Sequence, residues 1–267
     1  MSTRREEMLK EMGLAPLWRL RSEAQTPGAG ERRRGASLRS AQEETPRLDQ
    51  RTEGNPGFPS VTSFPAVDDR AATIMRMDWT ALKAAVAQCM SCPLHAKRTN
   101  TVFGVGDEHA EWLFVGEGPG AEEDALGDPF VGQAGKLLDN MLAAIKLKRG
   151  ENVYIANVIK CRPPGNRNPE SAEMLACAPF LQRQIELLKP KLIVALGRVA
   201  AVNLLAREAS IASLRGRMHE YKGIPLIVTY HPAYLLRSLT EKARAWEDLC
   251  FAVQTMQGLQ TGAAAHI

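Results

Sequence analysis

The sequence predicts a three-layer α/β/α protein, in which helices cover both faces of a central four-stranded parallel sheet. Four short apolar segments alternate along the chain with longer segments whose apolar residues recur at helical spacing. Each short segment is apolar almost throughout, as expected of a strand that is buried on both faces. The apolar content of 45% over 267 residues is ordinary for a globular core.

Residues 1–76 are predicted to be an extension that precedes the folded part. Residues 5–20 have the apolar spacing of a short helix. From residue 21 to about 76, Pro, Gly, Ser, Arg and Glu dominate without any period. Such a segment cannot bury enough apolar surface to offset the entropy lost on ordering. We therefore expect a flexible linker behind a helix that could dock an unidentified protein partner.

The folded domain is expected at residues 77–258, with a tail at 259–267. Asp78 is a good N-cap for a first helix over residues 79–88. The next elements follow from the alternation of the two periods. Strands are expected at 112–115, 153–159, 191–196 and 224–229, and helices at 134–147, 170–188, 199–207 and 240–256.

Three polar features follow the predicted strands, where ligands of parallel sheets bind. Gly-Glu-Gly-Pro-Gly at 116–120 comes after the first strand, Asn157 lies at the end of the second, and His231 follows the fourth. Because the carboxyl ends of parallel strands meet at one edge of the sheet, we expect these residues to lie together.

The glycine-rich segment superficially fits the dinucleotide-binding fingerprint. The acidic residues Glu122, Glu123 and Asp124 follow at once and would repel a pyrophosphate, and Lys136 stands where an acidic ribose-binding residue is expected. Glycines here would instead let a ligand approach the backbone closely. Glu117 would then present a carboxylate to the pocket; the alternative is an exposed loop acid.

Three other residues each have a structural and a functional interpretation. An amide at Asn157 in an apolar strand is costly unless it is satisfied, either by capping a bulge or by reading a ligand edge such as O4 and N3–H of uracil. Phe130 is either a core residue or a stacking platform for a base. His231 is either structural or a hydrogen-bond donor or acid.

Four of the five cysteines form two pairs, Cys89-x2-Cys92 and Cys161-x15-Cys177. No signal peptide and no run of 18 apolar residues is recognised, so we expect a cytoplasmic protein without membrane spans. Thiols stay reduced there, and the pattern indicates a four-cysteine zinc or iron–sulfur site. The spacing does not separate the two metals. Cys250 is expected to be a buried core thiol.

Taken together, these motifs resemble the uracil-DNA glycosylase superfamily, and specifically its family 4 enzymes with an iron–sulfur cluster. The resemblance covers about residues 80–257, and the four cysteines have the order and spacing of that family. It is carried by Gly-Glu-Gly-Pro-Gly-Ala-Glu-Glu-Asp (116–124), Asp-Pro-Phe-Val-Gly (128–132), Asn-Val-Ile-Lys-Cys-Arg-Pro-Pro (157–164), Asn166-Arg167 and His-Pro-Ala-Tyr (231–234).

The resemblance implies cleavage of the N-glycosidic bond of deoxyuridine in single- or double-stranded DNA, which leaves an abasic site for base excision repair. It also implies a structural [4Fe–4S] cluster on Cys89, Cys92, Cys161 and Cys177. The protein is expected to be a monomer. The net charge of +4 favours a polyanionic partner only weakly.

By the same resemblance, Phe130 would stack on a flipped uracil, Asn157 would read its edge, and His231 would donate a hydrogen bond to O2. Glu117 would activate water and stabilise the cationic sugar, while Glu123 would shape the pocket against the methyl group of thymine. Gly118 stands where related families carry Asp, so Glu117 would have to compensate for this missing water activator.

Two other classes of protein remain open at this stage. One is a catalytically silent iron–sulfur module that binds DNA in replication or repair. The other is a redox protein that uses the cluster for electron transfer.

Overall fold

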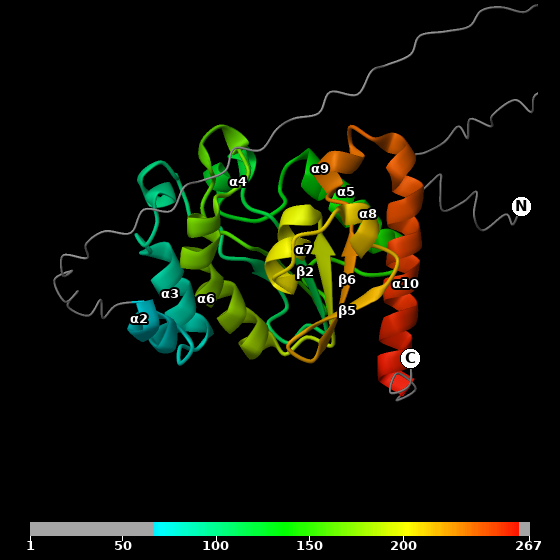
Figure 1. Cartoon of the computed structure of the whole chain (residues 1–267), viewed down its shortest axis with the longest axis horizontal. Helices are drawn as coiled ribbons and strands as arrows, with labels where there is room; N and C mark the ends of the chain where they lie inside the picture. The colour runs from blue at the N-terminus through cyan, green and yellow to red at the C-terminus, as the bar shows by residue number, and fades with distance from the viewer. Residues whose placement is uncertain (1–66, 262–267) are drawn as a thin grey trace, which may run out of the picture.

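The computed structural model describes residues 67–261, and these residues form a single mixed sheet with helices on both faces (Figure 1). The sheet has six strands in the order β1-β3-β2-β4-β6-β5. Its four central strands are parallel, as predicted, whereas β1 and β5 pair antiparallel at the two edges. The strands are β1 (Val105–Gly106), β2 (Trp112–Gly116), β3 (Val153–Asn157), β4 (Leu192–Leu196), β5 (Met218–Tyr221) and β6 (Ile224–Thr229).

The prediction of a four-stranded sheet was therefore wrong, because it missed the two antiparallel edge strands. Strand β1 has only two residues, which is too short for any period to show. Strand β5 alternates exposed and half-buried positions and so lacks the continuous apolar run of the central strands. Lys222 and Gly223, both at positive φ, connect β5 to β6 as a two-residue hairpin turn.

The helices lie mostly where the periodicity predicts them. The α-helices are α2 (Val67–Ile74), α3 (Trp79–Ala87), α4 (Ala121–Leu126), α5 (Gln133–Ala144), α6 (Ser171–Leu188), α7 (Arg198–Leu205), α8 (Ile211–Leu214), α9 (Pro232–Leu235) and α10 (Lys242–Thr261). Asp78 caps α3 through a hydrogen bond from the Ala81 N–H, as expected.

The two ends of the folded domain differ from the prediction, as do the ends of β3 and α5 by two or three residues. Helix α2 lies inside the segment expected to be a linker; its last residue, Ile74, is buried in the core, and the helix contacts α6. Helix α10 continues to Thr261, into the expected tail. The expected helix at residues 5–20 lies outside the described residues.

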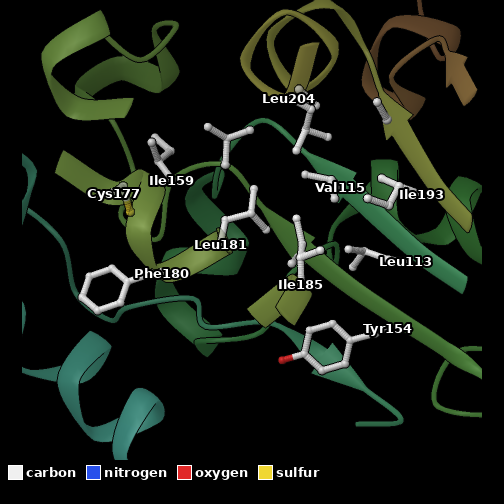
Figure 2. Packing of buried hydrophobic residues seen from close by; sticks show 14 of the residues in the cluster. Leu113, Val115, Tyr154, Ile159, Cys177, Phe180, Leu181, Ile185, Ile193 and Leu204 are labelled. Carbon is white, nitrogen blue, oxygen red and sulfur yellow. The ribbon is translucent and has the colours of Figure 1, made fainter. Parts of the chain in front are cut away.

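One face of the sheet packs against α3, α6 and α7. Figure 2 shows Leu113, Val115 and Ile193 of the sheet directed toward Leu181 and Ile185 of α6. The opposite face packs against α5 and α10 through a second apolar cluster. In Figure 1, α2 and α3 lie beside α6 at one end of the molecule and α10 runs along the other. The predicted three-layer architecture is confirmed.

The register of the parallel strands brings the expected site residues to one edge of the sheet. Gly116 at the end of β2 pairs with Asn157 at the end of β3, and Leu196 of β4 pairs with Thr229 of β6, two residues before His231. Within residues 67–261, no helix is long and apolar enough to cross a membrane.

Candidate active site

A cleft of about 460 Å³ opens at the carboxyl ends of β2, β3 and β6. Its size is in the ordinary range for small-molecule sites. Because it is bounded by loops that follow three strands of one sheet, it gathers residues that lie more than 100 positions apart in the sequence. All six residues predicted to be catalytic or substrate-binding line it: Glu117, Gly118, Glu123, Phe130, Asn157 and His231.

The absence of a side chain at Gly116 brings two of these residues together. A Cβ atom there would lie 2.5 Å from Asn157 Oδ1 and 2.6 Å from Phe130 Cζ, closer than real Cβ contacts. Gly118 is similarly crowded, with Ile159 Cγ1 2.6 Å from where its Cβ would be. The glycines of this loop therefore make room for the amide, the aromatic ring and the next strand.

Asn157 is almost fully buried, at 2% exposure, yet its Oδ1 has no hydrogen-bond partner among residues 67–261. An unpaired buried carbonyl loses its hydration without compensation, which costs about 1–3 kcal/mol. The amide oxygen thus caps no bulge. Asn157 also lines the cleft, so its amide forms part of the cleft wall.

Glu117 follows β2 directly and lines the cleft. Burial raises the pKa of its carboxyl group above the ordinary value of 4.5. Its protonation therefore changes at a higher pH than that of an exposed glutamate, which is typical of carboxyl groups used as acids or bases.

His231 is the N-cap residue of α9, and its Nδ1 accepts a hydrogen bond of 3.1 Å from the Ala233 N–H. In the neutral ring the proton is then on Nε2, which becomes the donor. Burial lowers the pKa of His231 to about 4, helped by Arg237 and opposed by Glu123. The ring stacks on Phe130, with centroids 5.5 Å apart. At neutral pH, His231 is thus an uncharged, oriented N–H donor.

Glu123 contacts the backbone of two loops. Its Oε2 accepts a hydrogen bond from the Gly120 N–H (3.1 Å), and its Oε1 accepts from the N–H groups of Val131 (3.0 Å) and Gly132 (3.2 Å). It lines the cleft, where a pocket-shaping role was expected. The carboxylate also ties the glycine-rich loop to the loop that carries Phe130.

No role was predicted from the sequence for the other cleft residues, although several of them belong to the motifs that carry the family resemblance. Arg237 comes six residues after His231, just beyond α9, and its nearness in the sequence to His231 was the one available signal for it. Ile159 follows β3 and was assigned to the strand itself. The remaining lining residues are Pro119, Gly120, Ala134, Pro163, Asn166, Arg167, Asn168, Ala233 and Tyr234.

The four paired cysteines line a second, separate cavity. Cys89 and Cys92 follow α3, Cys161 follows β3, and Cys177 lies in α6. Within residues 67–261, no three His, Cys, Asp or Glu side chains form a group that could hold one metal ion. Cys250, expected to be buried, is only partly buried and lies apart in α10.

Cationic side chains surround this cavity. Arg98 Nη1 donates to Cys161 Sγ (3.2 Å) and to the Cys89 carbonyl (2.7 Å). Arg70 Nη2 of α2 lies 3.7 Å from Cys89 Sγ as a donor. Burial raises the pKa of the Cys177 thiol to about 12 and also raises that of Cys161. These thiols would lose their protons readily only when a metal replaces them.

The sequence also matches a known family. The family model described as "Uracil DNA glycosylase superfamily" matches residues 103–250, which is more than half of the chain. The chain therefore belongs to the uracil-DNA glycosylase superfamily.

Similar curated proteins indicate which type of uracil-DNA glycosylase the chain resembles. The chain is 49% identical over 159 residues to a "Type-4 uracil-DNA glycosylase" of Archaeoglobus fulgidus, a match covering 57% of this chain and 79% of the relative. It is 47% identical over 161 residues to that of Thermotoga maritima (60% and 83% covered) and 41% identical over 181 residues to that of Pyrobaculum aerophilum (65% and 92%). The resemblance to family 4 is confirmed.

We predict that His231 stays neutral, as its Nε2–H tautomer, down to about pH 4. The unfolded chain binds this proton below about pH 6.5, so acidification from there to pH 4 should lower the free energy of unfolding. Side-chain ¹⁵N NMR of the imidazole rings across this pH range measures both the tautomer and the pKa. A His231 that titrates near 6.5, or one protonated on Nδ1 when neutral, would contradict the assignment.

Proposed function

We propose that this chain excises uracil from DNA by hydrolysing the N-glycosidic bond of deoxyuridine, leaving an abasic site for base excision repair. The observation that carries the proposal is the buried, unpaired Oδ1 of Asn157, in a cleft that also holds Phe130 and neutral His231. The relatives named type-4 uracil-DNA glycosylases support the same activity.

Recognition begins with a base drawn out of the DNA stack, because its glycosidic bond is inaccessible within a duplex. The flipped base stacks on Phe130. Asn157 Oδ1 accepts from N3–H of uracil while its Nδ2 donates to O4. Cytosine presents an acceptor at N3 and a donor at N4, the reverse pattern, so one fixed amide discriminates between the two bases.

Hydrolysis places negative charge on the leaving base and positive charge on the sugar. The C1′–N1 bond breaks with its electron pair moving to the uracil ring, where His231 Nε2–H donates to O2. A donor already oriented in a water-poor site stabilises this charge without reorganising. The Glu117 carboxylate stabilises the cationic sugar and accepts a proton from the water that bonds to C1′. Activity should therefore fall with acid as Glu117, rather than His231, is protonated.

We infer that Cys89, Cys92, Cys161 and Cys177, which line one cavity, hold a [4Fe–4S] cluster. A single zinc ion would draw all four sulfurs to about 2.3 Å from one point. Four cysteines that line one cavity are a ligand set that suits either metal group, and the resemblance to family 4 favours the cluster. When bound, the cluster supplies a covalent link between α3, the end of β3 and α6.

The partner of this activity is uracil-containing DNA, single- or double-stranded. A silent DNA-binding module is disfavoured, because it has no physical need for Glu117, Asn157 and His231 in one cleft. The monomeric state and a protein partner for the N-terminal extension stay predictions.

Purified without oxygen, the protein should show the visible absorbance of an iron–sulfur cluster and release free uracil from an oligonucleotide with one deoxyuridine. Glu117→Gln should lower the single-turnover rate about 10²- to 10⁴-fold, because the amide cannot accept the water proton. Adding His231→Asn should lower it further. Chromatography of the released base measures the rate.

Glu108→Gln provides the matched control, since Glu108 is a surface partner of Lys83 and should leave the rate unchanged. If the wild type bears the cluster yet releases no more uracil than the double variant, the chain is a silent module. A colourless protein that still releases uracil would contradict the assignment of an iron–sulfur cluster to the four cysteines.

Asn157→Asp should lower the ratio of uracil to cytosine release at least about tenfold, because the Nδ2 donor to O4 is lost. Asn100→Asp is the control for the same change of side chain, because Asn100 bonds the backbone carbonyls of Asp124 and Ala125 and lies outside the residues that line the cleft. Competition between uracil and cytosine oligonucleotides gives the ratio. An unchanged ratio in folded Asn157→Asp would mean that the base edge is read elsewhere.

A further inference from the structure

Phe130 has a strained backbone. Its φ is +55°, in the left-handed region that bulky L-residues rarely adopt. Such strain persists only where the surrounding structure imposes it, and it is concentrated at functional sites. The ring is 6% exposed and stacks on His231, so the strained backbone carries a side chain that lines the cleft. The groups that hold the Phe130 backbone in this conformation therefore help to form the site.

A single guanidinium holds this backbone. Arg149, in the connection between α5 and β3, donates from Nη1 to the Pro129 carbonyl (2.8 Å) and from Nη2 to the Phe130 carbonyl (2.9 Å). Its Nε donates to Asp139 Oδ1 of α5 at 2.9 Å, which fixes the plane of the fork. Two consecutive carbonyls are thus bound by one rigid, planar group, a geometry that the single ammonium of lysine cannot reproduce.

The same loop is held on its other side. Glu123 accepts from the two N–H groups that follow Phe130, those of Val131 and Gly132. Gly135 of α5 lies against the Phe130 carbonyl with no room for a Cβ atom. Two carbonyls and two N–H groups around the strained residue are therefore engaged, and the helix backbone lies directly against it.

We propose that Arg149 is a positioning residue that holds Phe130 in its left-handed conformation and so places the ring for stacking on the flipped base. Arg149 is not among the residues that line the cleft, so it acts through Phe130 rather than on the substrate. The inference deepens the proposed function and rests on it for the role of the ring. Without the fork, the backbone relaxes and the ring leaves the position in which a base stacked on it presents its edge to the Asn157 amide.

A double-variant cycle tests this inference. Arg149→Lys keeps the charge but not the fork and should lower the single-turnover rate of uracil release about 10- to 100-fold. In the Phe130→Ala background the same substitution should have little further effect, because the ring it positions is already gone. Far-UV circular dichroism and cluster absorbance report whether each variant is folded and loaded.

Arg183→Lys is the matched control. Arg183 also bridges a backbone carbonyl, that of Met77 (2.7 Å), and a neighbouring carboxylate, that of Glu186, and the two arginine side chains are similarly exposed at 19% and 24%. It should leave the rate unchanged. Equal losses from Arg149→Lys with and without Phe130, or equal losses in both arginine variants, would assign Arg149 a general structural role and overturn the inference.

A second measurement does not depend on activity. Chymotrypsin cleaves after exposed phenylalanine, and Phe130 is buried in the wild type, where Arg149 holds its backbone. Native-state proteolysis should therefore cut after Phe130 faster in Arg149→Lys than in the wild type or in Arg183→Lys, as mapped by mass spectrometry. An unchanged cleavage rate overturns the inference. If the wild type releases no uracil but this difference persists, the proposed function fails while the positioning of Phe130 stands.

Discussion

The site depends on the empty space at Gly116. Because β2 and β3 pair in register, Gly116 lies opposite Asn157 at the carboxyl edge of the sheet, and the space that a Cβ would fill is taken by the Asn157 amide and the Phe130 ring. The pairing of two strands thus determines where an acceptor and an aromatic face meet. His231 lies at the same edge for a similar reason. Strand β6 pairs with β4 up to Thr229, and two residues later His231 begins α9 as its N-cap.

The cleft and the cysteine cavity share one stretch of chain. Asn157 and Cys161 are four residues apart, and Lys160 between them is buried, with Nζ donating to the Asn157 carbonyl (2.9 Å) and to Gln184 Oε1 of α6 (2.6 Å). Burial lowers the pKa of this lysine to about 8, and the nearby cysteines oppose that shift. A cluster that links Cys161 to α6 would therefore also hold the backbone of Asn157 in place. This arrangement explains why a cluster far from the chemistry would have a structural role.

The central sheet and the glycine, asparagine and histidine of the site could be predicted because local patterns encode them: continuous apolar runs end in polar residues at strand tips. Strand β5 and helix α2 could not, because each is half polar and is held by contacts with distant elements; Arg70 of α2, for example, donates to the Ala176 carbonyl and lies over Phe180. The role of Arg149 could not be predicted for the same reason. Its role follows from backbone carbonyls 19 and 20 residues away, and no periodicity records such contacts.

The rate of uracil release by Gly116→Ala tests this account most directly. The position has ordinary extended backbone, so alanine introduces no dihedral strain and adds only a methyl group between Asn157 and Phe130. We predict a folded, cluster-bearing variant whose single-turnover rate on a deoxyuridine oligonucleotide is lower by about 100-fold or more, because the amide and the ring are pushed apart. A folded variant that releases uracil at the wild-type rate would contradict the dependence of the site on this space.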